Sequence, residues 1–337
     1  MIAHNLPTLG LEEKASATRV LGSGWVAQGT EVEAFENELC EFLDIPSGHA
    51  VAVSSGSAAL YLALWALDGG CKRIGLPVYA CAALRNAVGL VNGECVYLDC
   101  ARDTPNVHIN AANEANIDIL IAPSMFGIPV ELPDRTHFKV IEDIAQSLGA
   151  MVSGKRIGLR GELGICSFYA TKLMTTGGQG GAVIGLDKKI IDRIRDYREF
   201  DCRDDSKLRF NFQMTDLQAA IGREQLKKLP IFLTKRNQIF EIYRNAGLQM
   251  LDGSSDLIQP VRYRAILHSN KPFNIIKSLQ KNGVRAIVPI EQWELLDNSE
   301  KYKNANQSTL NMVSLPIYPL LNKNDAKLIA KISKDFV

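Results

Sequence analysis

Short apolar runs alternate along the first two thirds of the chain with longer segments of helical period. The runs at residues 50–53, 94–98 and 117–122 have the length of buried strands. Residues 57–67 and 80–91 are predicted helices, and the first is apolar all round, which indicates burial. Further strands are expected at residues 73–76, 139–142, 165–168 and 182–186. Because parallel strands need crossover connections, this alternation predicts an α/β fold, a three-layer domain with a mostly parallel central sheet.

Two helix starts carry a capping box, in which Ser or Thr is followed three residues later by Glu or Gln. Thr30 and Glu33 form the first pair, and Thr215 and Gln218 form the second. The helix that opens at Thr215 is expected to run to about residue 229, where Pro230 interrupts it before helix resumes.

The pattern changes after Gly247. Helices are predicted at residues 272–281 and 324–332, and extended segments at 256–267, 284–288 and 310–315. These elements predict a small C-terminal α+β domain, residues 247–337, behind a large domain of residues 1–246.

Composition narrows the class of protein without naming a function. The 337 residues are 46% apolar and 22% charged, which excludes wholesale disorder. Thirty-eight basic residues against thirty-seven acidic ones leave a net charge of +1, so no whole-chain attraction to nucleic acid or an anionic membrane is expected. Ser54–Ser57 break the most apolar window, residues 49–67, too early for a membrane span.

The seven cysteines form no Cys-x-x-Cys pair, and no histidine stands at zinc-ligand spacing beside them. The first residues show no basic region followed by an apolar run. We therefore expect reduced cysteines, no metal and a cytoplasmic protein.

Two glycine-rich stretches resemble nucleotide-binding motifs without completing them. Gly149-x4-Gly154-Lys155 lacks the Ser or Thr that a P-loop needs next, since Arg156 follows. Residues 177–181 precede a predicted strand, where a dinucleotide fingerprint would follow one. A nicotinamide-linked oxidoreductase is therefore not expected.

Three other segments combine into a more specific pattern. Ser55, Gly56 and Ser57 lie where a strand turns into a buried helix, and a helix N-terminus of this kind suits a phosphate, although such turns are also common structural features. A predicted strand ends in Glu142 and Asp143, where a carboxylate could hold a protonated ring nitrogen or simply cap a helix. Lys172 follows a buried strand and precedes a glycine-rich turn, which fits a Schiff-base lysine as well as a surface one.

A phosphate cradle, a ring carboxylate and a Schiff-base lysine, in this order, describe a pyridoxal phosphate site. The chain resembles the DegT/DnrJ/EryC1/StrS family of sugar aminotransferases over nearly its whole length. The motifs that carry the resemblance are Gly24-x4-Gly29, Phe35-Glu36, Ser55-Gly56-Ser57-x-Ala59-Leu60, Glu142-Asp143-x-Ala145-Gln146-Ser147-x-Gly149-Ala150, Ser167-Phe168-x3-Lys172, residues 211–220 with Gln225-Leu226, and residues 315–319.

The resemblance implies the aspartate aminotransferase type of fold and a role for each site residue. By the resemblance Lys172 and Asp143 are catalytic, Lys172 forming the Schiff base with the cofactor and Asp143 pairing with its ring nitrogen. Gln146 would contact the ring hydroxyl. Gly56, Ser57 and Ser167 would hold the phosphate. Asn211 would reach the phosphate of the neighbouring subunit, because sites in this family lie at a homodimer interface.

The resemblance also implies the reaction, in which L-glutamate gives its amino group to a nucleotide-linked keto-sugar for bacterial polysaccharide or amino-sugar biosynthesis. Three places depart from the family pattern: Cys81 stands where an aromatic residue stacks on the ring, Gln213 replaces an arginine, and residues 288–293 replace a His/Tyr-containing stretch. A sugar dehydratase, a cyclitol aminotransferase and a non-catalytic cofactor-binding regulator remain as alternatives. The family's dehydratases carry His where this chain has Lys172, which favours aminotransfer.

Overall fold

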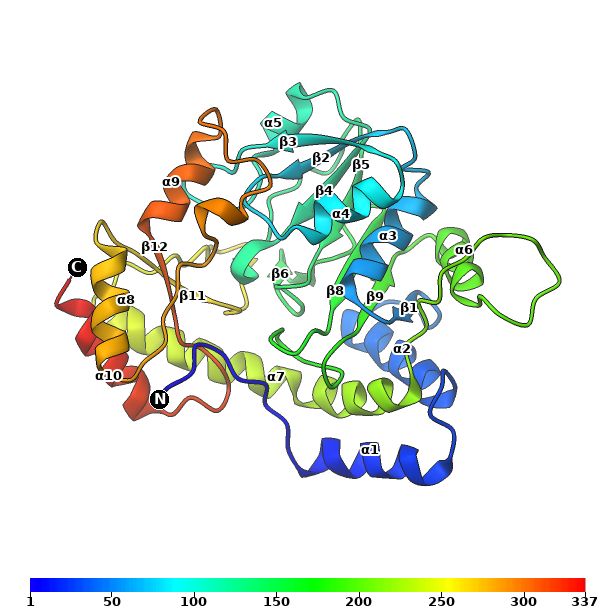
Figure 1. The fold of residues 1–337 in the computed structure, drawn as a ribbon, viewed down its shortest axis with the longest axis horizontal. Coiled ribbons are helices and arrows are strands. Elements are labelled where there is room, and N and C mark those ends of the chain that lie inside the picture. Colours follow the sequence, from blue (N-terminus) through cyan, green and yellow to red (C-terminus); the bar gives the residue numbers. More distant parts are fainter. Residues whose placement is uncertain (337) are drawn as a thin grey trace.

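The computed structural model describes residues 1–336 and is built around a seven-stranded sheet (Figure 1). The strands lie in the order β1-β9-β8-β5-β4-β2-β3, and all run parallel except β9. Their bounds are Ala50–Val53 (β1), Arg73–Pro77 (β2), Glu94–Leu98 (β3), Ile119–Pro123 (β4), Lys139–Asp143 (β5), Leu163–Ser167 (β8) and Gly181–Ile184 (β9). The predicted α/β fold with a mostly parallel sheet is confirmed.

Helices cover both faces of this sheet (Figure 1). One face packs against α3 (Gly56–Ala66), α4 (Ala83–Leu90) and α6 (Lys188–Arg198), and the other against α2 (Thr30–Leu43) and α7 (Asp216–Asn245). Side chains of β1 alternate between the two cores, since Val51 and Val53 join the first and Ala50 and Ala52 the second. A strand buried on both faces must be apolar at every position, which explains the continuous run in the sequence.

The helix predicted to begin with the Thr30 capping box starts differently. Thr30 is already its first helical residue, and the cap position is Gly29, which has no side chain to accept a hydrogen bond. Asp216 of α7 replaces it, because its carboxylate accepts from the N–H groups of Gly29 (2.8 Å) and Val32 (3.1 Å). The second box, at Thr215, forms as predicted.

The expected break at Pro230 is also wrong, because α7 continues through it to Asn245. A proline inside a helix removes one hydrogen bond and costs about 3 kcal/mol. Here Leu229 and Phe232, on either side of the proline, are both buried in the protein. Tertiary packing therefore holds the two halves in one helix.

The C-terminal residues form a smaller unit beside the end of α7, at the left in Figure 1. A two-stranded sheet of β11 (Ala265–His268) and β12 (Met312–Leu315) packs with α8 (Pro272–Lys281) and α10 (Lys323–Lys334). Residues 284–288 make only isolated bridges to Ile2 and β12, and the helix α9 (Lys303–Asn311) was not predicted. The division into domains 1–246 and 247–337 stays a prediction.

The remaining elements are short apart from α1. They are α1 (Leu11–Ser23), α5 (Ile109–Glu114), β6 (Met151–Val152), β7 (Lys155–Arg156), β10 (Ile258–Gln259) and the 3-10 turns η1 (Met125–Gly127) and η2 (Gln292–Glu294). The P-loop-like stretch becomes the β6–β7 hairpin, which agrees with its rejection as a nucleotide-binding motif. No helix within residues 1–336 combines the length and apolar character that a membrane crossing requires.

Candidate active site

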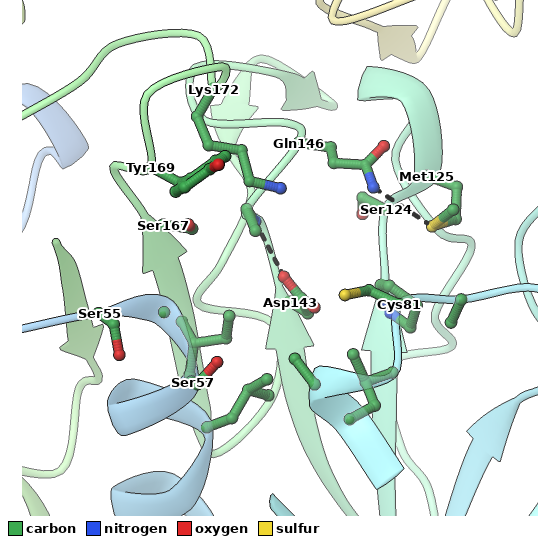
Figure 2. Close-up of a pocket in the computed structure, with 18 of the residues that line it drawn as sticks. Ser55, Ser57, Cys81, Ser124, Met125, Asp143, Gln146, Ser167, Tyr169 and Lys172 are labelled. Carbon is green, nitrogen blue, oxygen red and sulfur yellow. Dashed lines mark hydrogen bonds between the residues drawn. The ribbon is translucent and has the colours of Figure 1, made fainter. Parts of the chain in front are cut away.

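A cavity of about 230 Å³, called the cofactor cavity below, opens at the edge of the sheet where the parallel strands end (Figure 2). Residues at or just beyond the ends of β4, β5 and β8 line it together with the start of α3. Open α/β sheets bind ligands at this edge. Every residue predicted for the cofactor except Asn211 lines the cavity: Gly56, Ser57, Asp143, Gln146, Ser167 and Lys172.

The start of α3 is arranged as an anion site. The Ser55 hydroxyl accepts a hydrogen bond from the N–H of Ala58 (3.1 Å), which leaves the N–H groups of Gly56 and Ser57 for a ligand. A Cβ atom on Gly56 would stand 2.9 Å from the Cβ of Ser167, so only glycine allows the end of β8 to approach this closely. The Ser167 hydroxyl is thereby held against the helix N-terminus.

Asp143 and Glu142 are neighbours in sequence but face different surroundings. Asp143 lines the cofactor cavity and accepts one hydrogen bond, from the N–H of Ala145 (2.9 Å). Glu142 is fully buried away from it, in an ion pair with Arg160 (2.5 Å). Burial raises the pKa of Asp143, whereas the hydrogen bond and the positive charge of Lys172 act to lower it. Of the two carboxyl groups, only Asp143 can meet a ligand in the cavity.

Lys172 comes from the loop between β8 and β9, and its side chain extends into the cavity (Figure 2). It is half-buried, and its Nζ lies 5.4 Å from the ring centre of Tyr263, a residue of the C-terminal part of the chain. Burial would raise the pKa of Tyr263, but the charges of Lys172, Arg264 and Arg236 and a hydrogen bond with Thr171 together hold this pKa below its usual value. The Tyr263 ring therefore forms one wall beside the amine.

Gln146 is oriented by the η1 turn. Its Oε1 accepts from the N–H of Phe126 (2.8 Å), and its Nε2 lies 3.7 Å from the sulfur of Met125 (Figure 2). Met125 and the neighbouring Ser124 line the cavity and were missed in the sequence. Both follow β4, a predicted strand, so their place at the carboxyl edge of a parallel sheet was a usable signal.

The remaining sequence predictions have different outcomes. Asn211 is exposed, accepts from the N–H of Gln213 (3.0 Å) and does not line the cavity, so its role across a dimer interface stays a prediction. Cys81 does line the cavity, as expected of the residue that replaces an aromatic platform. Gln213 does not line the cavity, and its Nε2 donates to the Oε2 of Glu199 (3.5 Å).

A second cavity of about 510 Å³, called the vestibule below, adjoins the first and shares Cys81, Gln146 and Lys172 with it. Its other walls come from α4, from residues 263–264 and from residues 289–296, which include Trp293. Tyr263 and Arg264 carry no motif in the sequence that points to the site, whereas residues 288–293 stood out only as a departure from the family pattern.

The residues of the cofactor cavity fit pyridoxal phosphate. A helix N-terminus with two serine hydroxyls suits a phosphate, a buried carboxylate suits a protonated ring nitrogen, and a lysine suits the aldehyde. In the part of the chain that the structure describes, no three His, Cys, Asp or Glu side chains are grouped to hold a metal ion.

Comparisons with known proteins agree with this chemistry. The chain is 28% identical to an uncharacterised protein of Methanocaldococcus jannaschii, covering 98% of this chain and 96% of that one. It is also 28% identical to GDP-perosamine synthase of Escherichia coli O157:H7, covering 74% and 73%. The structure superposes on the aminotransferase TlmJ of Streptoalloteichus hindustanus with a TM-score of 0.91 at 23% identity, covering 99% and 98%, which shows the same fold.

The sequence pattern of one family matches residues 7–333. The chain therefore belongs to the DegT/DnrJ/EryC1/StrS aminotransferase family, a family of pyridoxal-phosphate-dependent enzymes, as its motifs predicted.

Proposed function

We propose that this aminotransferase moves an amino group from L-glutamate to a nucleotide-linked keto-sugar in polysaccharide or amino-sugar biosynthesis. The observation that carries the proposal is that Lys172, Asp143 and Ser167 meet the start of α3 in one cavity. The similarity to GDP-perosamine synthase supports a sugar nucleotide as acceptor. The vestibule supports a large substrate, because it offers about 510 Å³ directly beside the lysine.

The residues divide the work between holding the cofactor and moving a proton. Gly56, Ser57 and Ser167 would bind the phosphate, Gln146 would contact the ring hydroxyl, and Asp143 would keep the ring nitrogen protonated. When bound, pyridoxal phosphate supplies the electron sink for the carbon that loses a proton.

Lys172 first holds the cofactor and then acts through its Nζ. With the amino donor in place, the free amine of Lys172 would take a proton from the donor's reacting carbon and hold it for return. The buried ring of Tyr263 lies beside that amine and keeps water from this side of it. The donor would leave as a keto acid whose new oxygen comes from water. The same residues would act in reverse order on the keto-sugar, whose carbonyl oxygen would leave as water.

A homodimer with shared sites is part of the proposal. The segment between α6 and α7 extends away from the rest of the chain (Figure 1), and Leu208 and Phe210 are exposed on it next to Asn211. Exposed apolar residues of this kind suit an interface. Asn211→Ala should release the cofactor about tenfold more readily while the dimer persists in sedimentation; unchanged cofactor affinity would contradict a role across the interface.

The reaction is tested with purified protein, L-glutamate and a panel of nucleotide-linked 3-keto and 4-keto hexoses. Aminotransfer predicts an amino-sugar and 2-oxoglutarate in equal amounts by mass spectrometry. Loss of water from the sugar would instead identify a dehydratase, and amination of a cyclitol alone a cyclitol aminotransferase. Cofactor binding without any turnover would identify a regulator. We also propose a cytoplasmic location, which the free cysteines support.

A further inference from the structure

We propose that Arg264 binds the carboxylate of the amino-acid donor, an inference that rests on the proposed aminotransfer. Arg264 lies immediately before β11 and lines the vestibule together with Lys172. Both cations lie near one aromatic ring, since the Lys172 Nζ is 5.4 Å and the Arg264 Cζ 5.6 Å from the ring centre of Tyr263. An α-amino acid carries its carboxylate on the reacting carbon, so a cation close to the lysine is where that carboxylate needs one.

The guanidinium of Arg264 has no acidic partner within residues 1–336. Its side-chain contacts are the Nε2 of His4 (3.4 Å) and the hydroxyl of Ser314 (3.3 Å). Burial, followed by the charges of Arg264, Arg285 and Arg236, lowers the pKa of His4 to about 3, so His4 is neutral and offsets no charge. A half-buried cation without a counter-ion is costly to maintain unless an anion joins it.

Glu294, an acidic residue of the vestibule, does not act as the counter-ion of Arg264. Glu294 lines the same vestibule but is exposed, and its Oε2 accepts from the N–H of Glu291 (2.8 Å) at the start of η2. No ion pair joins it to Arg264 in the described chain. The guanidinium therefore stays open to a ligand that enters the vestibule.

The backbone around Arg264 is fixed against the η1 turn. The Arg264 N–H donates to the carbonyl of Phe126 (3.4 Å), and the Val261 N–H donates to that of Gly127 (3.0 Å). Gly127 has a φ of +95°, and a Cβ atom there would stand 1.8 Å from the carbonyl oxygen of Val261. Only glycine permits this contact, so Arg264 is held in place before any substrate arrives, which lowers the entropic cost of binding.

The diphosphate of the acceptor is the other anion that could use an arginine here. A sugar ring separates it from the keto carbon that reacts at Lys172, so it must lie farther out. Arg85 of α4 lines the vestibule and is exposed, which suits the outer position better than the half-buried Arg264 does. The observations therefore favour the donor carboxylate at Arg264.

The first test measures the two half-reactions separately by the absorbance change of the bound cofactor. Arg264→Gln should raise the glutamate concentration for half-saturation about 10- to 100-fold, as loss of a charged hydrogen-bonded pair does, with a smaller effect on the limiting rate. The acceptor half-reaction should change less than about threefold. Arg264→Lys, which keeps the charge but not the planar fork, should fall between wild type and Gln.

Arg285→Gln is the matched control, because Arg285 is close enough to act on His4 but lines neither cavity. It should leave both half-reactions near wild type, which separates direct contact from long-range charge. Equal losses in Arg264→Gln and Arg285→Gln, or a loss confined to the acceptor, would overturn the proposal, and the latter would assign Arg264 to the diphosphate.

A second test does not need turnover. Glutarate has the two carboxylates of glutamate without its amine, and its binding to the cofactor-loaded protein can be measured by titration calorimetry. It should bind wild type and Arg285→Gln but at least tenfold more weakly to Arg264→Gln, with retained cofactor showing that the variant is folded. Failure of wild type to bind glutarate would contradict the carboxylate site. Arg264-dependent binding in a protein that aminates nothing would refute the proposed function and leave this site standing.

Discussion

The cofactor cavity and the vestibule share Lys172 but are built in different ways. Most residues of the cofactor cavity stand at the ends of parallel strands or in the loops and helix starts that follow them, where the sequence shows strand-to-loop junctions. The vestibule adds residues 263–264 and 289–296, which fold onto the site from the C-terminal part of the chain. The first is a product of local sequence and sheet topology, whereas the second depends on how two packed units meet.

This difference suggests a division of chemistry. Groups that hold the cofactor and move its proton lie where the sheet fixes them, with Gly56 pressed against Ser167 and Asp143 at the end of β5. The groups that would select the donor and the acceptor line the vestibule instead, where Arg264 and Trp293 come from the C-terminal part of the chain and Arg85 comes from α4. Changes in the first region should therefore affect both half-reactions, and changes in the second should affect one substrate at a time.

The largest expected effect belongs to Lys172→Ala. Loss of a positioned acid–base group costs about 10² to 10⁴ in rate, and here the covalent anchor is lost as well. Both half-reactions should nearly vanish, while the phosphate site at α3 keeps the cofactor bound without a covalent link. Absorbance and equilibrium dialysis measure this, with the exposed Lys155→Ala of the β6–β7 hairpin as a control that should remain active. Full turnover in Lys172→Ala would refute the proposed chemistry.

Asp143→Asn should have the next largest effect. The amide cannot stabilise a protonated ring nitrogen, so we expect about a 10²-fold loss in both half-reactions with the fold intact. Steady-state rates and circular dichroism measure the two outcomes. Glu142 cannot replace Asp143, because it is held in an ion pair with Arg160 outside the cofactor cavity. Near-normal rates would therefore mean that no carboxylate pairs with the ring.

The same contrast explains what the sequence could reveal. The strands of the central sheet, α8 and the Thr215 capping box were predictable, because apolar runs and cap residues act locally. The errors at Thr30 and Pro230 share one cause, since residues distant in sequence decide both: Asp216 caps α2, and packing carries α7 through its proline. Tyr263 and Arg264 carried no local signal. They reach the site only because the residues just before β11 hydrogen-bond to the η1 turn.

A pH experiment tests the surroundings of Arg264 without using activity, because the side chain of His4 contacts its guanidinium. The unfolded chain binds a proton on His4 near pH 6.5, whereas the folded protein does so only near pH 3, because burial and nearby arginines disfavour the charged ring. The free energy of unfolding must therefore fall as the pH drops from about 6.5 toward 3, by up to about 1.4 kcal/mol per pH unit from this group. In His4→Gln this part of the slope should disappear in denaturant titrations at pH 4 to 6. An unchanged slope of the free energy of unfolding against pH would mean that His4 can take up a proton in the folded protein.

The smallest expected effect concerns Trp293, at the mouth of the vestibule. Its side chain is 78% exposed on η2, and an indole in that position can stack on the base of a nucleotide-linked acceptor. Stacking on an aromatic residue contributes about 1–3 kcal/mol, and an exposed platform belongs at the low end. Trp293→Ala should therefore raise the KM of the acceptor about fivefold and leave the glutamate half-reaction unchanged.

Phe273→Ala on α8 is the control for Trp293, because this ring is 63% exposed and lines neither cavity. It should leave both substrates unaffected. If Trp293→Ala weakened the binding of glutamate as much as that of the acceptor, the residues of the vestibule would not act on one substrate at a time. The proposed difference between the vestibule and the cofactor cavity would then be wrong for the acceptor. If it weakened only the acceptor, as Arg264→Gln weakens only the donor, the two substrates would be selected by different residues of the same C-terminal unit. Selectivity could then change at either position while the residues of the cofactor cavity stay as they are.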